Sequence, residues 1–491
     1  MPRPSVALRL FLTTWLVYAA FLTTNVVRET YLAVAIGGDH TLRVDPYLGL
    51  HPDLFEIPGR GGYINSNPGA SLLGAAPYLL ARPAIAGVFA LRPDLAAPKP
   101  PASYDDPRPN RTNFMNEMRA RGLDVRLALA AIVTQVGLMA PLGALAVVML
   151  FGYLRSRGES ERAALGWSVV YALATPILFR SAFLNQNVLL AHAVLFAWIL
   201  LTRPRPGGRA ARQPAAWAAA GALLGFGLLL DYSAAPLAVV FGAWALAEGW
   251  QAGRLRGALR LGGACVAGAI GPVLLLLGYQ WLAFGVPWYP AQRYMPATEF
   301  SVRGWNGFAL PSLDLLWRNL VDPRYGLFAF SPLLAAGLAA PFAGRRDERG
   351  SEVAVALLAF VALWLFSSAN QFAHLQWNTG VRYLVPAVPL LFLLAIPVLR
   401  RMAAPWRWSL IASSALVSLA VAMMREDVPT SLGMLVTTGP TLPIMIVLGK
   451  TASAYAPFLA RGIQPYGALA VVLVVALALL PWWNRTSSPR V

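Results

Sequence analysis

"LRLFLTTWLVYAAFLTTNVVRETYLAVAIGGDH", residues Leu8 to His40, begins as an apolar run and ends in charged side chains. The part from Leu8 to Val27 has about the 20 residues that a helix needs to cross a bilayer. It is longer than the apolar part of a typical signal peptide and lacks a small-residue cleavage site behind it, so we expect it to remain as a first span. The charged residues that follow then begin a segment outside the membrane.

The composition indicates a membrane protein with many spans. Hydrophobic residues make up 57% of the 491 residues and charged residues only 13%, with a mean hydropathy of +0.56. This is too apolar for an ordinary soluble domain. The net charge of +18 is divided among short clusters between apolar runs, which is typical of topology signals and not of a nucleic-acid surface. The single Cys265 lies in an apolar run, which predicts a buried thiol.

Apolar runs of spanning length predict about 12 transmembrane helices. The runs cover residues 8–27, 126–154, 164–181, 186–202, 214–231, 234–250, 262–284, 326–343, 353–368, 383–399, 408–424 and 465–483. Arginine clusters occupy alternate gaps between these runs, so all of them can be cytoplasmic at once. We therefore expect both termini in the cytoplasm.

The run Ala70–Leu91 is not counted among the predicted spans because it contains two prolines and an arginine. If it crossed the membrane, every later arginine cluster would move outside, so we interpret it as a helix on the outer surface. Residues 28–125 then form one long external loop, and 285–325 and 425–463 are further external stretches. Since the cytoplasmic loops are short, we expect any chemistry on the outer face.

Acidic residues gather in the first external loop. Glu29, Asp45 and Asp53 are candidates for a general base that activates a hydroxyl acceptor. Asp39 and His40 are weak metal-ligand candidates, and the chain shows no His/Cys cluster with metal-ligand spacing. The alternative for each residue is a solvated loop whose charges simply end the first helix.

Other polar residues lie at the outer ends of apolar runs. "YINSN" places Tyr63 and Asn67 before a helix start, where they could bind the lipid-phosphate donor from above a cavity or only form a turn. Candidates for a substrate cavity come from "FRSAFLNQNVLLAHAV", which also contains Arg180, from "LLLDYSAAP" and from "QFAHLQWNTGVRYLVPAVP"; they are Asn187, His192, Asp231, Tyr232 and His374. A buried, unpaired polar group such as His192 would cost about 1–3 kcal/mol.

Two arginines stand directly before apolar runs that enter the bilayer from outside. Arg324 and Arg382 could merely anchor their helices at the interface. Together, guanidinium groups at headgroup depth are well suited to bind a lipid phosphate through bidentate hydrogen bonds.

Seven motifs, in this order, resemble the GT-C class of membrane glycosyltransferases: "RETYLAVA", "YINSNPGASLLGAAPYLL", "LNQNVLLAH", "GFGLLLDYSAAP", "FGVPWY", "DPRYGLFAFSP" and "WNTGVRYLVPAVPLL". The resemblance covers residues 8–400 and is to a bacterial branch that includes relatives of protein mannosyltransferases and lipid A aminoarabinose transferases. It implies an inverting transfer from a polyprenyl-phosphate sugar, with a divalent cation optional. Glu29 stands where the class usually has an aspartate, with Arg28 before it as a further phosphate ligand and Asp45 and Asp53 as rival bases. Asn67 stands where relatives often have a lysine, so Arg324 or Arg382 would supply that charge.

We therefore expect an all-α, GT-C-like bundle with interfacial helices in its first external loop. Residues 1–284 form the catalytic core, 285–400 complete the donor site and 401–491 are a variable C-terminal region. The predicted function is transfer of a monosaccharide from a polyprenyl phosphate to an envelope glycan, lipid or protein outside the bacterial cytoplasmic membrane. The alternative is a transporter or lipid flippase, but the polar residues collect at one face and not at the midplane. No partner nucleic acid and no certain cofactor are expected.

Overall fold

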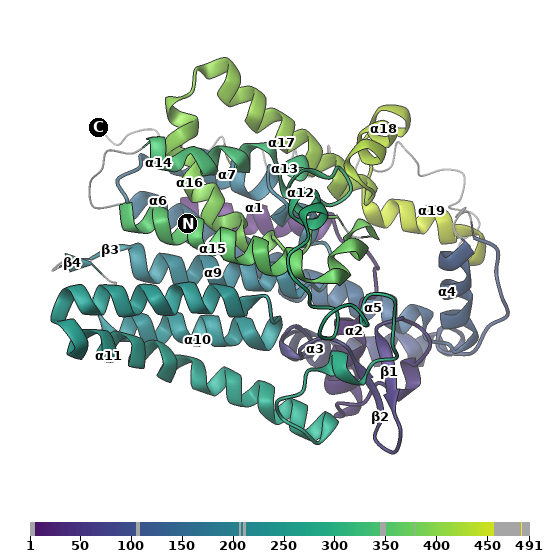
Figure 1. Cartoon of the computed structure of the whole chain (residues 1–491). Coiled ribbons are helices and arrows are strands. Elements are labelled where there is room, and N and C mark those ends of the chain that lie inside the picture. The colour runs from purple at the N-terminus through teal and green to yellow at the C-terminus, as the bar shows by residue number, and fades with distance from the viewer. Residues whose placement is uncertain are drawn as a thin grey trace.

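The computed structural model describes residues 5–104, 109–205, 208–209, 213–343, 350–378, 380–455 and 483. They form a bundle of helices with two short antiparallel hairpins (Figure 1). The predicted all-α class with membrane helices is confirmed, and the two hairpins are small additions to it.

The first half of the bundle consists of eleven helices: α1 Val6–Ala20, α2 Arg28–Val34, α3 Gly69–Leu91, α4 Pro109–Ala120, α5 Asp124–Thr134, α6 Ala140–Ser156, α7 Glu161–Leu173, α8 Ile177–Arg180, α9 Gln186–Thr202, α10 Pro214–Leu230 and α11 Ala234–Phe284. The second half comprises α12 Leu313–Val321, α13 Leu327–Phe330, α14 Ala340–Ala343, α15 Gly350–Ala369, α16 Val388–Arg401, α17 Ala404–Met424, α18 Val428–Thr438 and α19 Pro443–Tyr455. The strands are β1 Leu54–Ile57, β2 Gly61–Ile64, β3 Pro204–Arg205 and β4 Gly208–Arg209.

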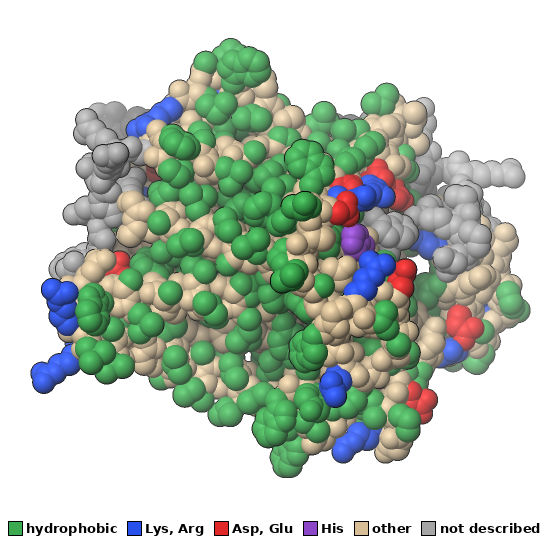
Figure 2. All heavy atoms as spheres, in the orientation of Figure 1, with side chains coloured by type: hydrophobic (Ala, Val, Ile, Leu, Met, Phe, Trp, Pro, Cys, Tyr) green, Lys and Arg blue, Asp and Glu red, His purple; other side chains and the backbone are tan. Residues whose placement is uncertain are grey.

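Five helical stretches are long and apolar enough to cross a membrane: α3, α5 with α6 (Asp124–Ser156), α11, α15 and α17. Shorter apolar helices include α1, α9 and α10. Figure 2 shows a band of hydrophobic side chains over α10, α11 and α15, with charged side chains at the two ends of this face. This distribution fits a protein with several membrane spans. The total of about 12 spans and their orientation stay predictions, as does the surface position of α3, whose 23 residues would also allow it to cross.

Helix α11 contains the two predicted spans 234–250 and 262–284 and reverses between them. Gly253 and Arg254 have non-helical backbone angles, and Arg254 lies in the left-handed region with φ of 53°. A Cβ atom on Gly249 would lie 2.3 Å from the carbonyl oxygen of Gly257, so the two halves touch near the reversal. Figure 1 shows them side by side with α10. Glycine is needed there because any larger side chain would push the halves apart.

Two predicted spans differ from the structure. The run 326–343 is not one α-helix, since α13 and α14 flank the 3₁₀ segment Pro332–Ala339. Ser331 is extended, and the N–H of Leu333 donates to Oγ of Ser414 on α17 instead of to its own helix. The first run also stops early, because the chain leaves α1 at Phe21 and continues without helical structure to Val27. The predicted span 465–483 lies outside the described residues except for Trp483.

The predicted external loop 28–125 is a folded unit. Helix α2 lies against α3, where a Cβ on Gly74 would come within 3.3 Å of the Ala33 side chain. The hairpin of β1 and β2 adds Phe55 and Tyr63 to a hydrophobic core that also contains Tyr31 of α2. The register of the hairpin pairs Leu54 with Ile64, so the residues on either side of it lie close together. This unit positions the acidic residues described next.

Candidate functional site

Arg28, at the start of α2, joins two carboxylates. Its Nε donates to Oε1 of Glu29 at 2.8 Å, and its Nη1 donates to Oδ2 of Asp53 at 2.7 Å. The side chains of Arg28 and Glu29 are 12% and 3% exposed, whereas that of Asp53 is 29% exposed. Three of the predicted site residues therefore meet in one place, and Asp53 is the carboxylate that a ligand could reach.

The hairpin holds Asp53 in this position. Asp53 directly precedes β1 and Asn65 directly follows β2, so the strand register brings them together. Nδ2 of Asn65 donates to Oδ1 of Asp53 at 2.7 Å, and the backbone N–H of Asp53 donates to Nδ1 of His51 at 3.0 Å. Because Nδ1 of His51 accepts this bond, the neutral imidazole carries its proton on Nε2.

The charges around Asp53 favour its ionised form. Burial acts to raise the pKa of Asp53, but Arg28, His51 and Arg382 together lower it by more, and it lies below the ordinary value. Burial lowers the pKa of His51, and the nearby Asp53 carboxylate offsets this only in part. Burial also acts to lower the pKa of Arg28, but Glu29 and Asp53 raise it by more. At neutral pH the site thus contains an ionised Asp53, a charged guanidinium on Arg28 and a neutral imidazole on His51.

Further arginines lie around this group. Arg382 precedes the turn Val385–Ala387 at the start of α16, and it is close enough to interact electrostatically with Asp53 and with Arg180. Arg180, the last residue of α8, is 1% exposed and also interacts with Glu29. Arg425, directly after α17, interacts with Arg180. Arg382 and Arg180 therefore add positive charge beside the carboxylates of the Arg28 group, and Arg425 lies next to Arg180; such a concentration of guanidinium groups is suited to an anion.

Four predicted site residues make other contacts. Asp45 accepts from the N–H of Gly62 and forms an ion pair with Arg43 at 2.8 Å, with 40% of its side chain exposed. Arg324 is 48% exposed and pairs with Asp322 at 3.0 Å.

Tyr63 donates to the carbonyl oxygen of Arg60 at 3.2 Å and packs edge-on against Phe284. Asn67 donates from Nδ2 to the carbonyl oxygen of Leu228 at 2.6 Å. Within the described parts of the chain, no hydrogen bond or ion pair joins these four residues to Arg28, Glu29 or Asp53.

The five predicted cavity residues occupy different surroundings. His192 and Asn187 of α9 are 3% and 1% exposed, and none of their side-chain nitrogen or oxygen atoms has a hydrogen-bond partner among the described residues. Asp231 ends α10 and accepts from the N–H of Ser233 at 2.8 Å. Tyr232 accepts from Gln280 of α11.

His374 lies beside α12. Its Nδ1 lies 3.9 Å from Oδ2 of Asp314, and its ring stacks on that of Phe300. The metal candidates Asp39 and His40 belong to no group of three or more His, Cys, Asp or Glu side chains among the described residues. Nε2 of His40 instead contacts Arg82 at 3.2 Å.

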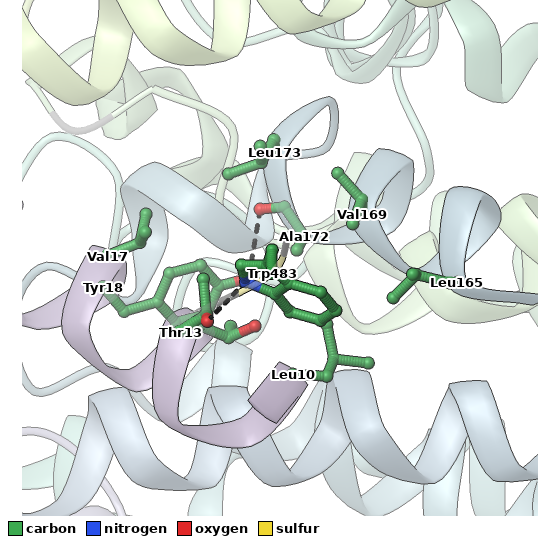
Figure 3. A pocket seen from close by; sticks show the side chains of 10 residues that line it. Leu10, Thr13, Val17, Tyr18, Leu165, Val169, Ala172, Leu173 and Trp483 are labelled. Carbon is green, nitrogen blue, oxygen red and sulfur yellow. Dashed lines mark hydrogen bonds between the residues drawn. The ribbon is translucent and has the colours of Figure 1, made fainter. Parts of the chain in front are cut away.

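A cavity of about 300 Å³ lies elsewhere, between α1 and α7. Figure 3 shows Trp483 seated between Leu10, Thr13 and Val17 on one side and Leu165 and Val169 on the other. Its Nε1 donates to Oγ1 of Thr13 at 3.1 Å. The lining is almost wholly apolar and contains none of the predicted site residues.

Sequence reasoning assigned no role to three residues of the arginine and carboxylate group. Arg180 stood in a quoted motif, but nothing in the motif shows that its side chain turns toward Glu29. Nothing in the sequence pointed to His51 or Arg425. His51 accepts a hydrogen bond from the backbone N–H of Asp53, which no motif reveals, and Arg425 lies beyond the residues that resemble the GT-C class. Only the folded chain brings them together.

No protein-family model matches this chain, and no curated protein matches it. Among solved structures, ArnT from Cupriavidus metallidurans bound to undecaprenyl phosphate aligns with 97% of this chain and 76% of its own, at 16% identity and a TM-score of 0.47. The same protein in the apo state aligns with 96% and 76% at 15% identity and a TM-score of 0.47.

Proposed function

We propose that this chain is a membrane glycosyltransferase that moves a monosaccharide from a polyprenyl phosphate to a hydroxyl group of an envelope acceptor. One observation carries the proposal: Arg28 joins Glu29 to the accessible Asp53, and further arginines lie around them. A carboxylate beside several guanidinium groups provides both a proton acceptor and a site for the leaving phosphate.

The reaction follows from this arrangement. The acceptor oxygen attacks the anomeric carbon of the donor, and its proton passes to the Asp53 carboxylate. The bond between that carbon and the phosphate oxygen breaks, and its electron pair stays on the phosphate. Arg28 and Arg382 stabilise the negative charge that develops there. A single in-line displacement of this kind inverts the anomeric centre.

The position of the group suits a donor that is held in a membrane. Arg28 follows the apolar helix α1, Arg382 precedes α16 and Arg180 lies between α7 and α9, so each cation is at a helix end. A prenyl tail could lie along the apolar helices while its phosphate reaches the arginines at headgroup depth. A hexose or pentose would then sit between the phosphate and Asp53.

The proposal also assigns the regions of the chain. Residues 1–284 form the catalytic core with the folded segment 28–125, and 285–400 complete the donor site through Arg382. The protein would lie in the cytoplasmic membrane of a bacterium, with both termini inside and the site outside. The predicted alternative, a transporter or lipid flippase, needs charged groups near the bilayer midplane, and the group around Arg28 lies at helix ends instead.

The test is transfer by the purified full chain from a panel of radiolabelled polyprenyl-phosphate sugars. Release of polyprenyl phosphate together with transfer or hydrolysis of the sugar is expected, and Asp53→Asn should abolish it. Asp45→Asn is the matched control, because Asp45 lies in the same segment but pairs with Arg43. If no sugar is released from any donor, or if Asp53→Asn keeps full activity, the proposal is wrong.

A further inference from the structure

The connection between α7 and α9, residues 174–185, has backbone carbonyl groups that other elements hold. A break in a helix leaves carbonyl oxygens without their usual partners, and in apolar surroundings each needs a donor. Four side chains outside the connection supply such donors: Ser331 to Ala174 O at 2.9 Å, Ser418 to Thr175 O at 2.9 Å, Arg425 to Phe179 O, and Gln135 to Ser181 O at 3.3 Å. The connection is therefore fixed from several sides.

Helix α17 provides two of these four donors. Ser418 belongs to α17, and Arg425 follows its last residue, Met424. Arg425 adopts a left-handed backbone conformation with φ of 64°, which is uncommon for a residue with a Cβ atom. That conformation ends α17 and is accompanied by the bond from the guanidinium group to the connection.

Arg425 and Arg180 share one aromatic ring. Their guanidinium carbons lie 5.0 Å and 5.2 Å from the centre of the Phe183 ring. Phe183 is 2% exposed, and such buried contacts between cations and a ring are favourable. The same ring thus orients both side chains, while the bond from Arg425 fixes the backbone one residue before Arg180.

We propose that Arg425 is a positioning residue that holds Arg180 in the donor-phosphate site. The C-terminal region then completes the site through α17, although it lies beyond the part of the chain that resembles known enzymes. Arg180 is 1% exposed, so it would attract the phosphate through its charge and not by direct contact, and Arg425 would act through it. This inference rests on the proposed function, because it takes the anion to be the phosphate of the donor.

Electrostatics support an anion at this place. Arg180 interacts with Arg382 and Arg425, which have the same charge, and with the carboxylate of Glu29. Bringing three guanidinium groups together is unfavourable, and the negative charge of a phosphate offsets that repulsion. An arginine held by a backbone bond and a ring is also pre-organised, so less side-chain entropy is lost when the phosphate binds.

The experiment measures binding of undecaprenyl phosphate to the purified full chain in lipid nanodiscs. We expect Arg425→Gln to weaken binding about tenfold, which corresponds to about 1.4 kcal/mol. Arg425→Lys should recover part of the affinity, since lysine keeps the charge but not the planar fork. In the Arg180→Gln background, Arg425→Gln should have no further effect, because its action passes through Arg180.

The matched control is Ser418→Ala. It removes another donor to the same connection from the same helix, without any change of charge, and should bind the lipid within about twofold of the unchanged chain. Binding by Arg425→Gln equal to that of the unchanged chain overturns the inference, as does an equal loss in Ser418→Ala or additive losses in the double variant. If Arg425→Gln does not fold, Arg425→Lys decides, since full affinity in that variant overturns the inference as well. Failure of the unchanged chain to bind the lipid overturns the proposed function and the inference together.

Discussion

Replacing Arg28 with glutamine should raise the pKa of Asp53 and move the acid limb of the transfer reaction to higher pH. Nη1 of Arg28 lies 2.7 Å from Oδ2 of Asp53. Glutamine removes the charge and keeps a polar side chain. The carboxylate must be ionised to accept a proton, so activity is present above its pKa and is lost as the pH falls through it.

The size of the effect follows from the geometry. Two unit charges about 4 Å apart interact by about 4 kcal/mol at an effective dielectric constant of about 20. The Asp53 side chain is 29% exposed, so water screens part of this interaction. We take half, about 2 kcal/mol, which is a change of about 1.5 pH units. Without the Arg28 charge, less of the effect of burial, which acts to raise the pKa of Asp53, is offset. The acid limb should therefore move to higher pH by about 1.5 units.

The assay is kcat/KM for transfer as a function of pH, with the donor that the panel identifies. A phosphodiester donor keeps its negative charge over this range, so the limb reports the enzyme. Asp45→Asn is again the control and should leave the limb in place, because Asp45 is 40% exposed and pairs with Arg43. Coincident acid limbs for Arg28→Gln and the unchanged chain would refute the assignment of Asp53 as the base.

Three further substitutions probe the surroundings. Glu29→Gln should lower kcat less than Asp53→Asn does, because Glu29 is 3% exposed and serves to hold the arginine; equal losses would contradict this. Arg324→Ala should change the binding free energy of the donor by less than about 0.5 kcal/mol, because the ion pair of Arg324 with Asp322 is exposed. A larger loss in a binding assay would show that Arg324 belongs to the donor site. Gly221→Ala would place a Cβ atom 1.9 Å from the carbonyl oxygen of Cys265 and so force α10 and α11 apart. The free energy of unfolding should fall by about 1–3 kcal/mol, and a maleimide should label the Cys265 thiol faster. An unchanged labelling rate would contradict this, because it would show that the two helices adjust without separating.

Hydropathy predicted most of the helices because a membrane helix is defined by its length and composition. It separated the two halves of α11 although no proline marks the reversal, since Arg254, Arg256 and Arg260 interrupt the apolar run there. It did not predict the break in the run 326–343, because hydropathy does not register that Pro332 lacks a backbone N–H and disfavours helical angles at Ser331. The N–H of Leu333 next to the break donates to Oγ of Ser414, which is far away in the sequence.

The candidate site also has a part that the sequence could predict and a part that it could not. Arg28, Glu29 and Asp53 could be named from the sequence because charged residues just beyond a span are conspicuous. The sequence could not separate Asp53 from Asp45, because both are aspartates of one loop. The hairpin makes the difference: its register brings Asn65 beside Asp53, while the N–H of Gly62 donates to Asp45.

The different exposure of the two carboxylates also explains why the base and the residue that holds the arginine must be different residues. A base has to reach the acceptor hydroxyl, and a carboxylate that is 3% exposed, such as Glu29, cannot do so without movement of α2. That movement is opposed by the bond from Oγ of Ser71 to the carbonyl oxygen of Glu29, which ties α2 to α3. Asp53 lies on a hairpin and not on a helix, and water already reaches it. Under the proposed function, Asp53 beside the hairpin therefore accepts the proton, and α2 positions Arg28 for the donor phosphate.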